Sequence, residues 1–131
     1  MNRRTLLALA VLCFPQWAAA QKPFTLEQIL RAPFAENLTS AKKVNRVAWT
    51  LDQEGKRNVW VAEGPLFSSR RLTSYVEDDG QEISQLSFSE DGNSLVYVRG
   101  GEKNTAGQYP NPTSNPLGAT QTVWVVAFAG G

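Results

Sequence analysis

The residues of this chain best suited to chemistry are four carboxylates close together in the sequence. Glu77, Asp78 and Asp79 are consecutive, and Glu82 follows shortly after them. Neighbouring carboxylates make a favourable site for an ammonium group, such as the amino terminus of a peptide substrate, because charge-assisted hydrogen bonds are strong. The alternative is that these side chains lie on a solvated loop. A run of charges favours the loop, so the cluster is a candidate binding site and no more.

The chain contains no histidine. This excludes an imidazole general base, the usual zinc ligand and a Ser-His-Asp triad within these residues. A Gly-x-Ser-x-Gly nucleophile motif, a phosphate-binding loop and a dinucleotide fingerprint are also absent from the sequence. We therefore expect no catalytic residue, no cofactor and no metal site in this chain.

The charge balance excludes two classes of partner. The sequence has 13 Lys and Arg against 12 Asp and Glu, for a net charge of +1, and no basic block stands out. Nucleic acid and anionic membrane surfaces are therefore poor candidates. Cys13 is the only cysteine, so no disulfide is expected within the chain.

Residues 1–20 have the pattern of a cleaved signal peptide. Arg3-Arg4 precedes an apolar stretch from Leu6 to Phe14, and Ala18-Ala19-Ala20 supplies small residues for cleavage. The stretch is too short for a membrane anchor, which needs about 20 apolar residues. A lipoprotein attached through Cys13 is the other alternative, but the residue before it is not small. The pattern predicts a periplasmic or secreted protein that leaves the membrane after cleavage.

Residues 21–34 are predicted to form an N-terminal segment with one short helix. Thr25 and Gln28 have the spacing of a capping box, and Pro33 ends the helix by excluding helical geometry from the residue before it. One side of this helix carries an apolar stripe, which we expect to pack on a larger body. The stripe consists of Leu26, Ile29 and Leu30.

Residues 35–131 contain a β-rich pattern that occurs twice. The runs 46–50 and 58–62 match the runs 94–98 and 122–126, with a spacing of 48 from Val47 to Leu95. A repeat of this period is typical of a propeller blade. We therefore predict an all-β chain that forms the first two blades of an incomplete β-propeller, since a closed one takes about 4–8 blades. Tryptophans at equivalent points of the strands are predicted to pack in the core; they are Trp49, Trp60 and Trp124.

Two kinds of connection are expected between these strands. Asp91-Gly92 and the segment 53–56 have the residues of tight hairpin turns, because Asp and Gly tolerate a positive φ. The segment 100–120 is rich in Gly, Pro, Asn, Ser and Thr. It predicts an irregular loop, far longer than the usual length of about 4–6 residues. This loop is either a solvent-exposed spacer or a segment that controls access to a site.

Several runs resemble the TolB-type propeller repeat. They are Arg71-Leu72-Thr73, Leu86-Ser87-Phe88-Ser89-Glu90-Asp91-Gly92, Leu95-Val96-Tyr97-Val98 and Val123-Trp124-Val125-Val126. Glu90 stands where this repeat usually has Pro, but the Asp-Gly pair is intact. Together with the signal peptide and the helix, residues 21–131 resemble the N-terminus of secreted bacterial serine peptidases of the prolyl oligopeptidase family. The runs that carry this second resemblance are 24–30, 55–62 and 78–82.

The resemblance implies a dipeptidyl aminopeptidase or acylaminoacyl peptidase. In that family a β-propeller restricts the entry of peptide substrates to an α/β-hydrolase domain that supplies the catalytic Ser, Asp and His. This chain would be the non-catalytic start of the propeller and inactive alone. The alternative is a TolB-like periplasmic propeller that binds a protein partner without catalysis. The oligomeric state does not follow from the sequence.

Overall fold

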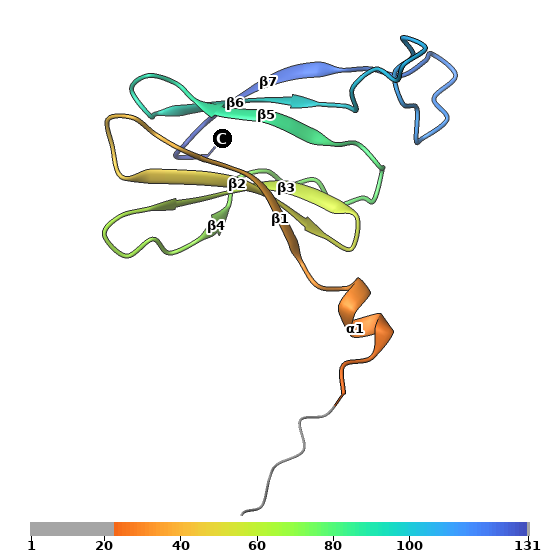
Figure 1. Ribbon diagram of the computed structural model, residues 1–131. Helices are drawn as coiled ribbons and strands as arrows, with labels where there is room; N and C mark the ends of the chain where they lie inside the picture. Colours follow the sequence, from red (N-terminus) through yellow and green to blue (C-terminus); the bar gives the residue numbers. More distant parts are fainter. Residues whose placement is uncertain (1–22, 131) are drawn as a thin grey trace, which may run out of the picture.

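The computed structural model describes residues 23–130 of the chain. It consists of one short helix and two antiparallel sheets that lie one above the other (Figure 1). The first sheet has four strands in the order β1-β2-β3-β4, and the second has three in the order β5-β6-β7. The bounds are α1 Leu26–Leu30, β1 Phe34–Ser40, β2 Arg46–Gln53, β3 Lys56–Glu63, β4 Arg70–Arg71, β5 Ile83–Phe88, β6 Ser94–Arg99 and β7 Thr122–Ala127. The all-β class is confirmed, and within the described residues neither sheet closes on itself.

The helix α1 begins as the sequence predicts. Thr25 Oγ1 accepts a hydrogen bond from Gln28 N, and Gln28 Oε1 accepts one from Thr25 N, both at 3.1 Å. This reciprocal pair is the capping box. The predicted packing of its apolar stripe is not found in the described residues, where every helical side chain is exposed. Figure 1 shows α1 set apart from both sheets.

Both predicted hairpin turns are present. Between β2 and β3, Glu54 and Gly55 have φ angles of 55° and 82°, and two successive positive φ values match the right-handed twist of the paired strands. Between β5 and β6, Gly92 has a φ of 73°. Asp91 Oδ1 accepts the backbone N–H of Asn93 at 3.0 Å in this second turn. The hydrogen bonds of the turns therefore come from the residue types that indicated them.

The repeat in the sequence is a repeat in the structure. The strands β1, β2 and β3 correspond to β5, β6 and β7 in sheet order and direction. The pairing of β1 with β2 is interrupted by a bulge between Glu36 and Thr39, and that of β5 with β6 by a bulge between Ser84 and Ser87. The two bulges are separated by the same interval as Val47 and Leu95, which is the spacing found in the sequence.

The core lies between the two sheets. Because successive side chains of a strand point to opposite faces, each sheet has one set of side chains that faces the other sheet. The first sheet contributes Ala48, Val59 and Val61, and the second contributes Ile83, Leu86, Leu95, Tyr97 and Phe128. The sheets approach each other most closely along β1 and β5.

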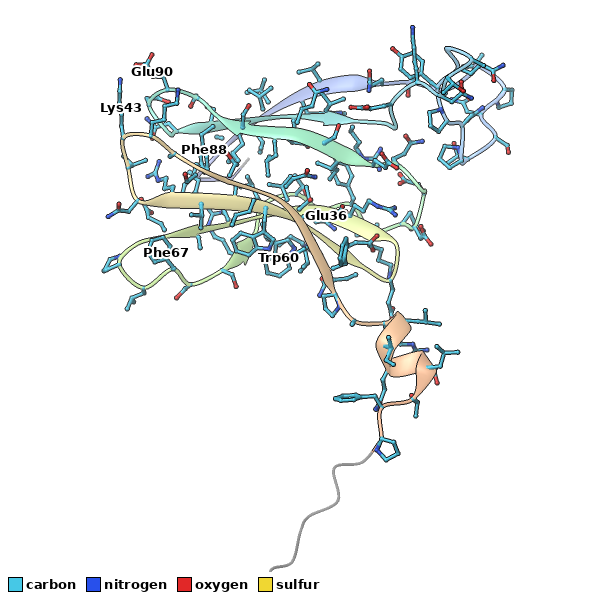
Figure 2. The ribbon with its side chains drawn as sticks, viewed as in Figure 1. Glu36, Lys43, Trp60, Phe67, Phe88 and Glu90 are labelled. Atoms are coloured by element: carbon cyan, nitrogen blue, oxygen red, sulfur yellow. The ribbon has the colours of Figure 1, made fainter. Side chains whose placement is uncertain are left out.

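The tryptophans are not in this core, so that prediction is wrong. Trp49 is paired with Trp60 across β2 and β3, on the face opposite to Ala48. Figure 2 shows Trp60 on the side of the first sheet that points away from the second. Trp124 is 46% exposed. For Trp49 and Trp60 the reason is the two-residue period of a strand, which gives the inner face to Ala48 and Thr50 and the outer face to the rings. Trp124 lies opposite Tyr97, on the core face, but β7 is the last strand of its sheet and the ring stays partly exposed.

Phe128 joins the two sheets after the end of β7. Its side chain is buried, and its ring centroid lies 6.2 Å from that of Phe88. Two guanidinium groups of the first sheet lie over the ring, with Arg46 Cζ at 4.2 Å and Arg70 Cζ at 5.0 Å from the centroid. Arg46 also donates to the carbonyl of Gly92 at 2.9 Å. Cations over an aromatic face therefore add to the apolar packing at this junction.

The segment between Arg99 and Thr122 contains no helix or strand, as predicted. Figure 1 shows it projecting from one end of the second sheet. The helix in residues 23–130 is too short to cross a membrane. The predicted signal peptide, residues 1–20, lies outside the described residues.

Candidate functional site

The four candidate carboxylates lie in the segment that joins the two sheets, after β4 and before β5. Its first part is fixed to the first sheet by Asn58, a buried polar residue of β3. Asn58 Nδ2 donates to the carbonyl of Tyr75 at 2.9 Å, and Asn58 Oδ1 accepts from Tyr75 N at 2.8 Å and from Thr73 Oγ1 at 3.0 Å. Because one buried amide forms all three bonds, it determines where the segment leaves the sheet.

Asp79 has a structural partner. Arg99 of β6 donates to Asp79 Oδ2, and the guanidinium also lies 4.1 Å above the ring of Tyr75. Asp79 Oδ1 accepts the backbone N–H of Gln81 at 3.0 Å. Burial disfavours the charged form of Asp79, but the hydrogen bonds from Arg99 and Gln81 outweigh it, and the pKa lies below its usual value. Asp79 therefore holds the connecting segment against the second sheet.

Glu77 and Asp78 are exposed. The carboxylate of Asp78 lies against the turn at Gly55, where an added Cβ would collide with Asp78 Cγ. The positive φ of 82° at Gly55 is what favours glycine there, since the exposed Asp78 side chain can move aside. These two residues thus correspond to the solvated loop that was the alternative for the cluster.

Glu82 lines a polar cleft of about 370 Å³ between the two sheets. The cleft lies where β1 and the start of β5 come together with the β2–β3 hairpin. The residues that line it are Phe34, Glu36, Asn37, Asp52, Arg57, Glu82, Ile83 and Ser84. Of the four candidates, Glu82 is the one among the residues that line this cleft.

Carboxylates dominate the charge of this cleft. Arg57 Nη2 lies 3.1 Å from Asp52 Oδ2, so the one cation of the lining is already paired. Glu36 and Glu82 form no ion pair within the described residues. The Oγ of Ser84 is buried without a hydrogen-bond partner in this part of the chain. The arrangement suits a ligand that brings a positive charge and hydrogen-bond donors.

The contacts of the cleft, as far as residues 23–130 show them, indicate neither a metal centre nor an activated nucleophile. Residues 23–130 bring no group of three or more His, Cys, Asp or Glu side chains together in a way that could hold a metal ion. The Oγ of Ser84 forms no hydrogen bond within the described residues to a base that would activate it as a nucleophile. The polar lining supports binding as the role of the cleft.

Sequence reasoning did not place the other three charged residues of the cleft in a binding site. Glu36, Asp52 and Arg57 come from different strands, so no local cluster in the sequence marks them. The usable signal was the repeat, because aligning its two halves places Glu36 and Ser84 at equivalent positions of β1 and β5. No protein-family model, no curated protein and no solved structure matches the chain.

Proposed function

We propose that the two sheets are consecutive blades of a β-propeller, and that this chain forms the non-catalytic start of a secreted serine peptidase of the prolyl oligopeptidase family. In such a protein the propeller controls which peptides reach a separate hydrolase domain. The observation that carries the proposal is the repeated sheet, whose strand order and bulge recur at the spacing of the sequence repeat. The peptidase assignment rests on the resemblance of the runs in residues 24–82.

The position of the cleft supports a role in substrate admission. In the proposed propeller the first strand of each blade would line the central channel. This fits β1 and β5, which are the strands of the two sheets that lie closest to each other. The cleft opens beside these two strands. Its free carboxylates, Glu36 and Glu82, are suited to the ammonium group of a peptide amino terminus.

The experiment follows the reading frame beyond Gly131 and purifies the natural full-length protein. It is treated with a fluorophosphonate probe, which labels activated serine nucleophiles, and is assayed with aminoacyl and acylaminoacyl chromogenic substrates. The proposal expects a downstream Gly-x-Ser-x-Gly motif, covalent labelling of its serine and release of the chromophore. The chain that ends at Gly131 is the control and stays unlabelled.

The alternative function has a distinct result in the same experiment. A TolB-like binding protein would contain further β repeats but no Gly-x-Ser-x-Gly motif, and the probe would not label it. That result would replace the peptidase assignment while keeping the propeller. A downstream sequence without further β repeats would contradict both.

A further inference from the structure

Each of the two stacked sheets has an outer apolar face that is partly exposed, although Val98 and Ala62 on these faces are buried. On the second sheet this face, called the Val face here, consists of Val96, Val123 and Val125. On the first sheet the outer face, called the Trp face here, consists of Ala35, Leu38, Val47 and Trp49. Val125 is 67% exposed and Leu38 is 76% exposed. Apolar faces of this kind mark interaction surfaces.

The Val face is the repeat of a surface that is already packed. The shift that relates Val47 to Leu95, called the repeat shift here, takes Ala48 of β2 to Val96 of β6. For β3 and β7 the spacing in the sequence is larger, because the long loop precedes β7. Val59 is therefore equivalent to Val123, and Val61 to Val125. In the first sheet these positions are fully buried against the second sheet. The Val face therefore has the shape and chemistry of a surface that receives a sheet.

The Trp face is the repeat of the surface that packs against it. The repeat shift takes each of its members to a residue of the buried core. The equivalent core residues are Ile83, Leu86, Leu95 and Tyr97. The molecule thus exposes both halves of its own internal interface, one on each outer side.

The polar contacts of the internal interface also have counterparts on the outer faces. Asn37 Nδ2 donates to the carbonyl of Ile83 at 2.9 Å. The repeat shift takes Asn37 to Gln85 and Ala35 to Ile83. In the proposed contact, the Gln85 carboxamide would therefore face the carbonyl of Ala35 in a second copy. Asn37 and Gln85 share a positive φ, of 54° and 52°. The backbone geometry that directs the first of these contacts is therefore already present for the second.

The ion pair between the two hairpins also has a counterpart on the outer faces. Lys43 Nζ lies 2.6 Å from Glu90 Oε1, and Figure 2 shows both side chains at neighbouring hairpins. The repeat shift turns this pair into Asp91 and Lys42, in which the signs are exchanged and remain opposite. Because Asp91 accepts hydrogen bonds from Ser89 and Asn93 in its own turn, the match here is one of opposite charges at the two hairpins.

We propose that the Val face of one copy of this chain binds the Trp face of a second copy, in the way that the two sheets bind each other. Each copy uses a different face, so the contact is heterologous and closes into a ring when the rotation allows. A propeller takes about 4–8 blades, so chains of two sheets would close at about two to four copies. The inference is independent of the peptidase assignment, and in a longer parent chain the next sheet of that chain takes the place of the second copy.

The test expresses the full chain, determines the mass of the purified product and follows its association by sedimentation velocity over a range of concentrations. Val125→Lys blocks the Val face and Leu38→Lys blocks the Trp face, both at exposed positions. Leu117→Lys is the matched control, because this side chain is 95% exposed in the long loop. We expect discrete assemblies from the wild type and from the control, and single chains from each face variant.

Mixing the two face variants tests the heterologous geometry. Each variant keeps one intact face, so the mixture should give a dimer with one copy of each and nothing larger. Val123→Lys repeats the test of the Val face at a second exposed position, and circular dichroism checks that each variant is folded. A wild type that stays a single chain, face variants that associate like the wild type, or a mixture that stays as single chains would each overturn the proposal.

Discussion

Asn37 and Gln85 occupy the same position of two successive sheets, each with a left-handed backbone at a β-bulge. Asn37 uses this geometry to reach the neighbouring sheet. Its Nδ2 donates to Thr50 Oγ1 at 3.1 Å and to the carbonyl of Ile83 at 2.9 Å. The Gln85 side chain is exposed on the second sheet. The same bulge geometry thus supports a contact between sheets at Asn37, whereas at Gln85 the side chain faces solvent.

The first prediction compares alanine at these two positions. Asn37→Ala should lower the free energy of unfolding by about 1–3 kcal/mol, because it leaves buried groups without a partner. Gln85→Ala creates the same backbone strain but removes no bond to another sheet, so its cost should be less than about 1 kcal/mol. Urea denaturation of both variants at equal protein concentration measures the difference. Equal costs would contradict the role assigned to Asn37.

The second prediction concerns Phe128. Phe128→Ala should cost about 3–5 kcal/mol, the usual range for a buried phenylalanine. It removes the ring that packs on Phe88 and lies beneath Arg46 and Arg70. Phe67→Ala is the control, since that ring is 48% exposed and should lose much less. Thermal denaturation followed by circular dichroism distinguishes them, and a neutral Phe128→Ala would show that the sheets do not depend on this junction.

The third prediction is a loss of stability in acid. The hydrogen bonds to Asp91 from Ser89 Oγ, from Asn93 N and from Asn93 Nδ2 lower the pKa of Asp91 to about 2. A lowered folded-state pKa stabilises the fold above the unfolded value of 3.8, and this contribution disappears as the pH falls towards 2. The urea midpoint should therefore fall over this range, with Asp79 adding to the effect in the same direction.

The variant Asp91→Asn distinguishes the contribution of this turn to the acid sensitivity from that of the other carboxylates. The variant should have a lower midpoint than the wild type at neutral pH and a shallower dependence on pH below the unfolded value of 3.8. Glu102→Gln, in the exposed loop, should follow the wild-type curve. A variant curve parallel to the wild type through this window would rule out Asp91 as a source of the acid sensitivity.

The fourth prediction rests on the proposed peptidase function and concerns the cleft in the longer protein which that function requires. Glu82→Gln should raise KM for peptides with a free amino terminus by about tenfold, which corresponds to one charge-assisted hydrogen bond of roughly 1.5 kcal/mol. The KM for amino-terminally acetylated peptides should not change. Glu77→Gln is the control, because Glu77 is not among the residues that line the cleft. An equal change for free and acetylated peptides would remove Glu82 from recognition of the amino terminus.

Local chemistry made much of the fold predictable. The capping box at Thr25 and the turns at Gly55 and Gly92 follow from residue types whose bonds are formed within a few positions. The repeat could be found in the sequence because equivalent strands of the two sheets have similar residues at equivalent positions. The strand β1 was not identified, because its polar residues and its bulge at Asn37 break the alternation that marks a strand.

The candidate site was less predictable, for a physical reason. Adjacent carboxylates in the sequence indicated one cluster, but Arg99 pairs with Asp79 across the connection between the sheets. Glu36 and Glu82 meet only because two sheets stack, which is long-range information that no local pattern contains. The prediction for Trp49 and Trp60 was wrong for a related reason, since alternation does not say which face of a strand the neighbouring sheet covers.

The central claim is that the contact between the first two sheets is one step of a repeating stack. An experimental structure of the natural full-length protein tests it most directly, through whatever covers Val123 and Val125. The account predicts a β-sheet on this face, related to β5–β7 by the rotation that relates β5–β7 to β1–β4. Valines that face solvent, or that pack against a helix, would contradict it.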